Sequence, residues 1–254
     1  MSKLTKLFKE KPNRLCSVYF TSGYPQLNDT VTVIKGLEAA GVDFLEVGLP
    51  YSDPMADGPT IQESSSIALK NGINLDVIFN QLETIKEDVN IPLIAMGYFN
   101  QVVRYGAERF CEKCQLVGIE TLVLPDMPMI EYETTYKALF AKYGLSNVFL
   151  ITPQTSEERI KKIDDMTDAF IYVVASSSIT GAKGSISTAQ IDYFNRIKSY
   201  NLKSTLIAGF GISSRETFDT VCEHVNGAII GSAFVKHVGV NGVDEIDAFV
   251  KAII

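Results

Sequence analysis

The sequence predicts a (β/α)8 barrel of the TIM type, and three observations carry this prediction. Eight short apolar runs rich in β-forming residues recur along the 254 residues. Each run is followed by a segment with helical periodicity. The chain length also matches the roughly 250 residues of a barrel built in this way. We therefore expect residues 1–254 to form one barrel domain, since no linker-like or low-complexity segment divides them.

The eight predicted strands are almost continuously apolar, which is typical of parallel strands that are buried on both faces. They cover residues 15–21, 43–49, 91–97, 120–125, 147–152, 169–175, 204–210 and 227–233. An open doubly wound sheet is the alternative arrangement of such units. The barrel is favoured, because no GxGxxG fingerprint opens a helix after the first strand.

The predicted helices place apolar residues at three- and four-residue steps, and several end on a glycine that suits a helix C-cap. They cover residues 29–41, 75–89, 107–118, 132–144, 156–166, 188–200, 213–225 and 243–254. Two further helices are expected outside this repeat. Residues 2–10 precede the first strand and would close the bottom of the barrel, and residues 60–72 fill the long gap after the second strand.

Charge and hydropathy argue against several classes of function. Lysine and arginine number 23 against 30 aspartates and glutamates, which gives a net charge of −7 with no basic tract. This argues against a surface for nucleic acid or for an anionic membrane. No apolar run approaches the roughly 18 residues of a membrane span, and the N-terminus lacks the apolar stretch of a signal peptide. We expect a cytoplasmic protein.

Cysteine and histidine predict no metal site. Cys111 and Cys114 form a CxxC pair in a helical pattern, but a zinc site needs four ligands and no second pair is present. The two histidines, His224 and His237, lie outside the predicted strands. No predicted strand interior contains a lysine that could form a Schiff base. Acid–base chemistry by carboxylates is the chemistry that remains.

One carboxylate lies inside a predicted core strand. Glu46 stands in "FLEVGLP", and the two-residue period of a strand places it on the same face as Phe44 and Gly48. If that face points into the barrel, burial raises the pKa of Glu46 and suits it to proton transfer. The alternative is a buried ion pair with a structural role. The predicted strand interiors hold no lysine or arginine, which favours the catalytic interpretation.

Two further acids, Asp53 and Asp57, follow in the loop "SDPMADGPT". Acids next to proline or glycine often form Asx turns, and a turn is our expectation for Asp53. For Asp57, a turn and a catalytic role are equally open.

Two strand ends predict an anion site. The stretch "GFGIS" (209–213) ends the seventh strand, "GSAFVKH" (231–237) ends the eighth, and each continues into a helical pattern. Glycine lets backbone N–H groups approach an anion, and a helix N-terminus favours negative charge. Loops after strands seven and eight are the usual phosphate site of such barrels. Residues 176–187 have the small, polar composition of a lid or of a long solvated loop, and Thr180 and Gly181 could join the phosphate site.

With these residues in place, the whole chain resembles the α subunit of tryptophan synthase. The most specific match is "EVGLPYSDPMADGPTIQ" (46–62), which follows that family's signature closely. Further matches, in the same order as in the family, are "FTSGYP" (20–25), "MGYFN" (96–100), "LPDMP" (124–128), "ITGAKG" (179–184), "GFGIS" and "GSAFVK". The chain departs from the pattern in "SSSITG", which lacks the arginine and glycine that many members carry before the lid.

The resemblance implies an activity and its residues. The family cleaves indole-3-glycerol phosphate to indole and glyceraldehyde 3-phosphate without a cofactor. Glu46 would then be the acid–base residue and Asp57 the acceptor of the indole N–H, with Thr180 placing the lid against Asp57. The phosphate would be held by Gly181, Gly211, Gly231 and Ser232. The indole pocket would be lined by Tyr19, Met96, Tyr98, Val123, Tyr172 and Phe210.

The resemblance also implies a partner. Indole would pass to a β subunit that carries pyridoxal phosphate, in an α2β2 heterotetramer. Asp53, Asn100 and Asp126 would face that subunit. Two rival functions stay open: a phosphosugar isomerase or epimerase on the same barrel, and a non-enzymatic subunit that only activates its partner. The first requires a second acid–base group on a facing strand, and the second does not require both carboxylates.

Overall fold

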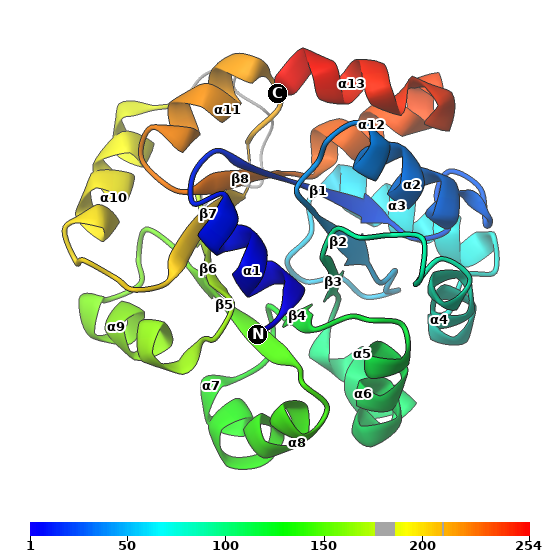
Figure 1. Cartoon of the computed structure of the whole chain (residues 1–254), viewed down its shortest axis with the longest axis horizontal. Coiled ribbons are helices and arrows are strands. Elements are labelled where there is room, and N and C mark those ends of the chain that lie inside the picture. Colours follow the sequence, from blue (N-terminus) through cyan, green and yellow to red (C-terminus); the bar gives the residue numbers. More distant parts are fainter. Residues whose placement is uncertain (176–185, 210) are drawn as a thin grey trace.

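The computed structural model describes residues 1–175, 186–209 and 211–254. Eight parallel strands close into a barrel in chain order, from β1 to β8 and back to β1 (Figure 1). The strands are β1 Leu15–Thr21, β2 Phe44–Gly48, β3 Leu93–Met96, β4 Thr121–Val123, β5 Ser146–Ile151, β6 Phe170–Val174, β7 Thr205–Gly209 and β8 Gly227–Ile230. The predicted fold class is confirmed.

A ring of helices surrounds the strands (Figure 1). They are α1 Lys3–Glu10, α2 Asp29–Ala39, α3 Pro59–Lys70, α4 Leu75–Glu83, α5 Phe99–Tyr105, α6 Ala107–Leu116, α7 Met129–Glu131, α8 Lys137–Lys142, α9 Glu157–Met166, α10 Thr188–Lys198, α11 Arg215–Cys222, α12 Ser232–Asn241 and α13 Ile246–Ile253. A π-helical turn, Tyr132–Tyr136, joins α7 to α8, and a 3-10 turn, Val243–Glu245, precedes α13. Both predicted extra helices are present, as α1 and α3.

The structure differs from the sequence prediction at several element ends and in one helix: the helix predicted at 75–89 ends at Glu83, and the strand predicted at 91–97 is Leu93–Met96. The last strand ends at Ile230, not at residue 233, because Gly231 leaves the extended conformation and Ser232 begins α12. Helix α5 was not predicted. It follows the "MGYFN" stretch, and its start depends on a distant side chain, since the Phe99 N–H donates to Asp126 Oδ1 at 2.7 Å.

No helix among the described residues is long and apolar enough to cross a membrane.

Strand register determines which side chains fill the barrel. Glu46 pairs with Tyr19 of β1 on one side and with Ile94 of β3 on the other. Parallel neighbours in register point the same way, and Tyr19, Ile94 and Phe44 all belong to the apolar cluster inside the barrel. The face of β2 that carries Glu46 therefore points inward, as the catalytic interpretation requires.

Helix α1 closes the barrel at the end where the strands begin. It lies across this lower end of the barrel in Figure 1, and Leu4 and Phe8 are its buried residues. The Phe8 ring packs edge-on against Phe44 at 6.0 Å and Phe170 at 6.2 Å, centroid to centroid. Because Phe44 and Phe170 are the first residues of their strands, this aromatic cluster seals the lower end and leaves the opposite end for chemistry.

We expect Phe8→Ala to lower the free energy of unfolding by about 3–5 kcal/mol, because it opens a cavity beneath the barrel. Urea unfolding followed by circular dichroism measures this loss. Lys6→Ala, on the same helix but away from the core, is the matched control and should change stability by less than about 0.5 kcal/mol. An unchanged urea midpoint for Phe8→Ala would show that α1 does not seal the barrel.

Candidate active site

Glu46 is enclosed inside the barrel without a hydrogen-bond partner. Its exposed fraction is 0%, and neither carboxylate oxygen has a partner among the described residues. No lysine, arginine or histidine of those residues lies within ion-pair distance of it. The structural alternative, a buried ion pair, therefore has no support within the described part of the chain.

Burial controls the protonation state of Glu46. Loss of hydration disfavours the charged carboxylate and raises the pKa of Glu46 from 4.5 to about 8. At neutral pH the side chain therefore carries its proton. A neutral carboxyl group in such a place can give a proton to a substrate and afterwards accept one.

Two tyrosines border Glu46 inside the barrel. Burial raises the pKa of Tyr19 and of Tyr172 well above the ordinary phenol value, and the charges of Glu46 and Asp57 raise both further. Tyr19 is also the register neighbour of Glu46 on β1. Strand-end glycines make room for them: a Cβ atom on Gly48 would overlap the Tyr19 hydroxyl, and one on Gly209 would overlap that of Tyr172.

Asp57 lies in the loop that joins β2 to α3. The Tyr98 hydroxyl donates to Asp57 Oδ2 at 2.9 Å and accepts from the Ala56 N–H at 3.0 Å. Burial raises the pKa of Asp57, and the bond from Tyr98 opposes that rise. The Asp57 carboxylate thus contacts a side chain from another loop, whereas a simple Asx turn would engage its own backbone.

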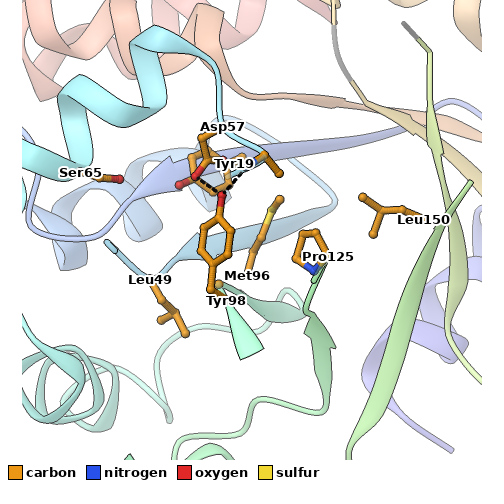
Figure 2. Close-up of a pocket in the computed structure, with 10 residues that line it drawn as sticks. Tyr19, Leu49, Asp57, Ser65, Met96, Tyr98, Pro125 and Leu150 are labelled. Atoms are coloured by element: carbon orange, nitrogen blue, oxygen red, sulfur yellow. Dashed lines mark hydrogen bonds between the residues drawn. The ribbon is translucent and has the colours of Figure 1, made fainter. Parts of the chain in front are cut away.

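A pocket opens at the carboxyl ends of β1 to β5, next to Asp57. Figure 2 shows the Tyr98 hydroxyl pointing at Asp57, with Tyr19 and Met96 beside them. The pocket is lined by Tyr19, Leu49, Ala56, Asp57, Ser65, Met96, Gly97, Tyr98, Pro125 and Leu150. Val123 and Tyr172 belong with Tyr19 to the apolar cluster inside the barrel.

Several of these lining residues had not been predicted. Leu150 of β5 and Pro125 after β4 stand at strand ends, so their positions alone could have indicated them. Ser65 is different, because it reaches the pocket from α3, and only the run of three serines in that helix hinted at a close approach.

The predicted phosphate residues are partly described. Gly231 is the N-cap of α12 and Ser232 is its first residue, with no side chain capping the first turn. A Cβ atom at Gly231 would lie 3.7 Å from Cβ of Tyr19, so this helix end lies beside the inner barrel. Gly211, after β7, has a φ of +83°, which favours glycine. Thr180, Gly181 and Phe210 lie outside the described residues.

Of the three residues expected to face a partner, Asp53 and Asp126 lie in the loops after β2 and β4, and Asn100 lies in the first turn of α5. Asp53 is exposed and accepts a hydrogen bond from the Ser52 hydroxyl. Asn100 is exposed, and its Nδ2 donates to the Tyr51 hydroxyl at 2.8 Å. Asp126 is exposed too and accepts the Phe99 N–H. All three residues are exposed, and their contact with a partner stays a prediction.

The described part of the chain contains no group of three or more histidine, cysteine, aspartate or glutamate side chains that could hold a metal ion. Cys111 and Cys114 are both buried and free, and burial raises the pKa of the Cys111 thiol to about 11. A thiol with that pKa is a poor nucleophile and a poor metal ligand at neutral pH.

The fold and the pocket define a class of protein: a TIM barrel with a carboxylate-bearing pocket at the carboxyl ends of its strands. The family profile described as "Tryptophan synthase alpha chain" matches residues 4–253. The chain is 52% identical, over 253 residues that cover 100% of both chains, to the tryptophan synthase alpha chain of Flavobacterium johnsoniae. The chain belongs to the tryptophan synthase alpha chain family.

Solved structures agree with this assignment. The tryptophan synthase alpha chain of Legionella pneumophila superposes with a TM-score of 0.89 at 27% identity, covering 100% of this chain and 96% of that one. A chain of the tryptophan synthase complex from Pyrococcus furiosus gives 0.86 at 30% identity, covering 94% and 97%.

Glu46→Gln should stabilise the protein increasingly as pH rises. Between about pH 4.5 and 8 the unfolded chain releases the Glu46 proton while the folded protein retains it. The free energy of unfolding of the wild type therefore falls across this window by about 1.4 kcal/mol per pH unit. Urea unfolding of both proteins at pH 5, 6.5 and 8 tests this. A stability difference that does not change with pH would show that Glu46 is not held protonated.

Proposed function

We propose that Glu46 and Asp57 are the acid–base residues with which this chain cleaves indole-3-glycerol phosphate to indole and glyceraldehyde 3-phosphate. One observation carries the proposal: a fully buried carboxyl group with a pKa of about 8 and no hydrogen-bond partner among the described residues. In the tryptophan synthase alpha chain family, a protonated carboxyl group such as that of Glu46 can begin the reaction by donating a proton to carbon.

The cleavage is a retro-aldol reaction that one carboxyl group can serve twice. Glu46 gives its proton to the ring carbon that bears the glycerol phosphate side chain, and the ring becomes a cation. The Glu46 carboxylate then takes the proton of the neighbouring side-chain hydroxyl. As the C–O bond becomes a carbonyl, the carbon–carbon bond breaks, and its electrons return to the ring. Glu46 ends the cycle protonated, as it began.

Asp57 stabilises the cation that forms on the ring. Its carboxylate accepts the indole N–H, so a negative charge stands where positive charge develops. The two acids divide the work because their surroundings differ. Among the described residues nothing donates to Glu46, whereas Asp57 receives a hydrogen bond from Tyr98.

We propose that the phosphate lies over the N-terminus of α12, on the N–H groups of Gly231 and Ser232, with Gly211 opposite. Free first-turn N–H groups and the helix dipole favour an anion there. The indole ring would then extend toward the pocket beside Tyr19, because a Cβ atom added to Gly231 would lie only 3.7 Å from Cβ of Tyr19. The carboxylates provide the chemistry, so the proposal gives this chain no cofactor.

We also propose a β-subunit partner that carries pyridoxal phosphate, an α2β2 assembly and a cytoplasmic location. Support comes from the solved Pyrococcus furiosus tryptophan synthase complex, one chain of which superposes on this one. The exposed side chains of Asp53, Asn100 and Asp126 offer a contact surface next to the Asp57 loop. All four cysteines are free, as is usual in a reducing compartment.

The isomerase alternative requires a second acid–base group opposite Glu46. The facing strand β6 contributes Tyr172, whose pKa burial raises well above the ordinary phenol value. A phenol with so high a pKa stays protonated at neutral pH and offers no base there. The protonation state of Tyr172 therefore favours the lyase.

Glu46→Gln and Asp57→Asn should each slow indole release about 10²–10⁴-fold, because the first removes the proton donor and the second removes the charge that stabilises the cation. Single-turnover release of indole from indole-3-glycerol phosphate by the purified chain measures both. Glu63→Gln, an exposed change on α3, is the control and should keep wild-type activity. Wild-type cleavage by Glu46→Gln would refute the assignment.

The pH dependence of cleavage should report the pKa of Glu46. Its carboxyl group must be protonated to begin the reaction, so kcat/KM should fall as pH rises through about 8. Steady-state rates between pH 6 and pH 9.5 test this. A rate that stays flat to pH 9.5 would contradict a protonated Glu46 in the starting enzyme.

A further inference from the structure

Tyr98 connects the segment between β3 and α5 to the Asp57 carboxylate in the loop between β2 and α3. It stands immediately before α5, and Figure 2 shows its ring rising from the β3 side with its hydroxyl directed at Asp57. Among the described residues, Tyr98 is the one side chain that donates a hydrogen bond to the Asp57 carboxylate, at 2.9 Å. The same hydroxyl accepts a hydrogen bond from the N–H of Ala56. Tyr98 therefore contacts two consecutive residues of the loop, Ala56 and Asp57.

The groups around Asp57 explain why the Tyr98 hydroxyl affects the ionisation of its carboxyl group. Titratable side chains that sense its charge come from three elements: Tyr19 of β1, Tyr172 of β6 and Tyr98 before α5. No lysine, arginine or histidine of the described residues lies within ion-pair distance of Asp57. Burial therefore acts against ionisation of Asp57, and the Tyr98 bond opposes it.

Tyr98 is itself held firmly. Its backbone N–H donates to Gln101 Oε1 at 2.9 Å, and Gln101 Nε2 donates to the Pro50 carbonyl at 2.9 Å. Its ring lies 5.1 Å from the ring of Tyr51, centroid to centroid. Asn100 in turn donates to the Tyr51 hydroxyl at 2.8 Å. A side chain fixed at its backbone and its ring can aim its hydroxyl with little freedom.

We propose that Tyr98 is a positioning residue that keeps Asp57 ionised and aimed into the pocket through this hydrogen bond. The inference rests on the proposed role of Asp57, and it assigns Tyr98 more than a place in the pocket wall. Tyr98 remains a donor throughout the working pH range, since burial raises the pKa of its phenol to about 12. Its influence should be greatest at acid pH, where Asp57 is closest to taking up a proton.

The test is Tyr98→Phe in the full chain, which keeps the ring in the pocket and removes the donor. The acidic limb of kcat/KM for indole release should move to higher pH, because Asp57 then holds a proton more readily. The loss in kcat/KM should be about ten- to hundred-fold at acid pH, the usual strength of a hydrogen bond to a charged group. It should shrink as pH rises toward 8.

A second readout does not depend on catalysis. Carboxyl resonances of protein labelled with ¹³C aspartate, with Asp57 assigned through Asp57→Asn, should show a higher pKa for Asp57 in Tyr98→Phe than in the wild type. If Asp57→Asn cleaves normally, the proposed function fails, while this titration still tests the link from Tyr98 to Asp57. Identical titrations of Asp57 in the wild type and Tyr98→Phe would overturn the inference.

The control is Tyr105→Phe at the other end of α5. The Tyr105 hydroxyl donates to Asp76, which is exposed and away from the pocket. This change also removes a tyrosine–aspartate hydrogen bond from the same helix, so it should leave the Asp57 titration and the pH profile unchanged. Equal shifts in both variants would mean that the effect is a general loosening of α5, which would overturn the inference.

A variant with the opposite sign covers the case in which Tyr98→Phe does not fold. Replacing Tyr98 with 3,5-difluorotyrosine by codon suppression keeps the shape of the ring and makes the hydroxyl a stronger donor. The pKa of Asp57 should then fall below the wild-type value, and the acidic limb should move to lower pH. An unchanged or raised Asp57 pKa would contradict the proposal.

Discussion

The burial of one carboxyl group without a partner is the constraint on which the rest of this structure depends. Closing eight strands around Glu46 removes water on every side, and the neutral form of the carboxyl group is then favoured. A facing lysine or arginine would cancel this effect by forming an ion pair. The inward neighbours in register, Tyr19 and Ile94, bring no cation. The apolar layers below, sealed by Phe8, hold the barrel together around this unfavourable group.

The two acids differ because Glu46 lies enclosed inside the barrel, whereas Asp57 lines the pocket at the carboxyl end of the strands. Glu46 belongs to a strand, and among the described residues nothing donates to it. Asp57 belongs to a loop at the mouth, where the Tyr98 hydroxyl reaches it. Burial raises the pKa of both carboxyl groups. The hydrogen bond from Tyr98 opposes this rise at Asp57. Two carboxyl groups of similar chemistry are thus held in different electrostatic environments within one barrel.

Strand prediction succeeded where hydrophobicity ends abruptly and was less accurate where it does not. The run "LCSVYFT" matches β1 at both ends, because polar residues flank it. The run that ends at Ile230 was extended to residue 233, since "GSA" is compatible with either a strand or a helix start. Helix α5 was not predicted, because the bond from Phe99 to Asp126 that supports its start spans 27 positions.

The sequence by itself determined the barrel, the strand that carries Glu46 and the family, since periodicity and motifs are local along the chain, whereas strand register showed that the Glu46 face points inward. It left the role of Asp57 open between a turn and catalysis. Only the tertiary structure placed Tyr98 against Asp57, 41 positions away, and left Glu46 without a partner among the described residues. The reason is physical: barrel closure brings the ends of distant strands together, and contacts between their loops depend on that closure rather than on spacing in the chain.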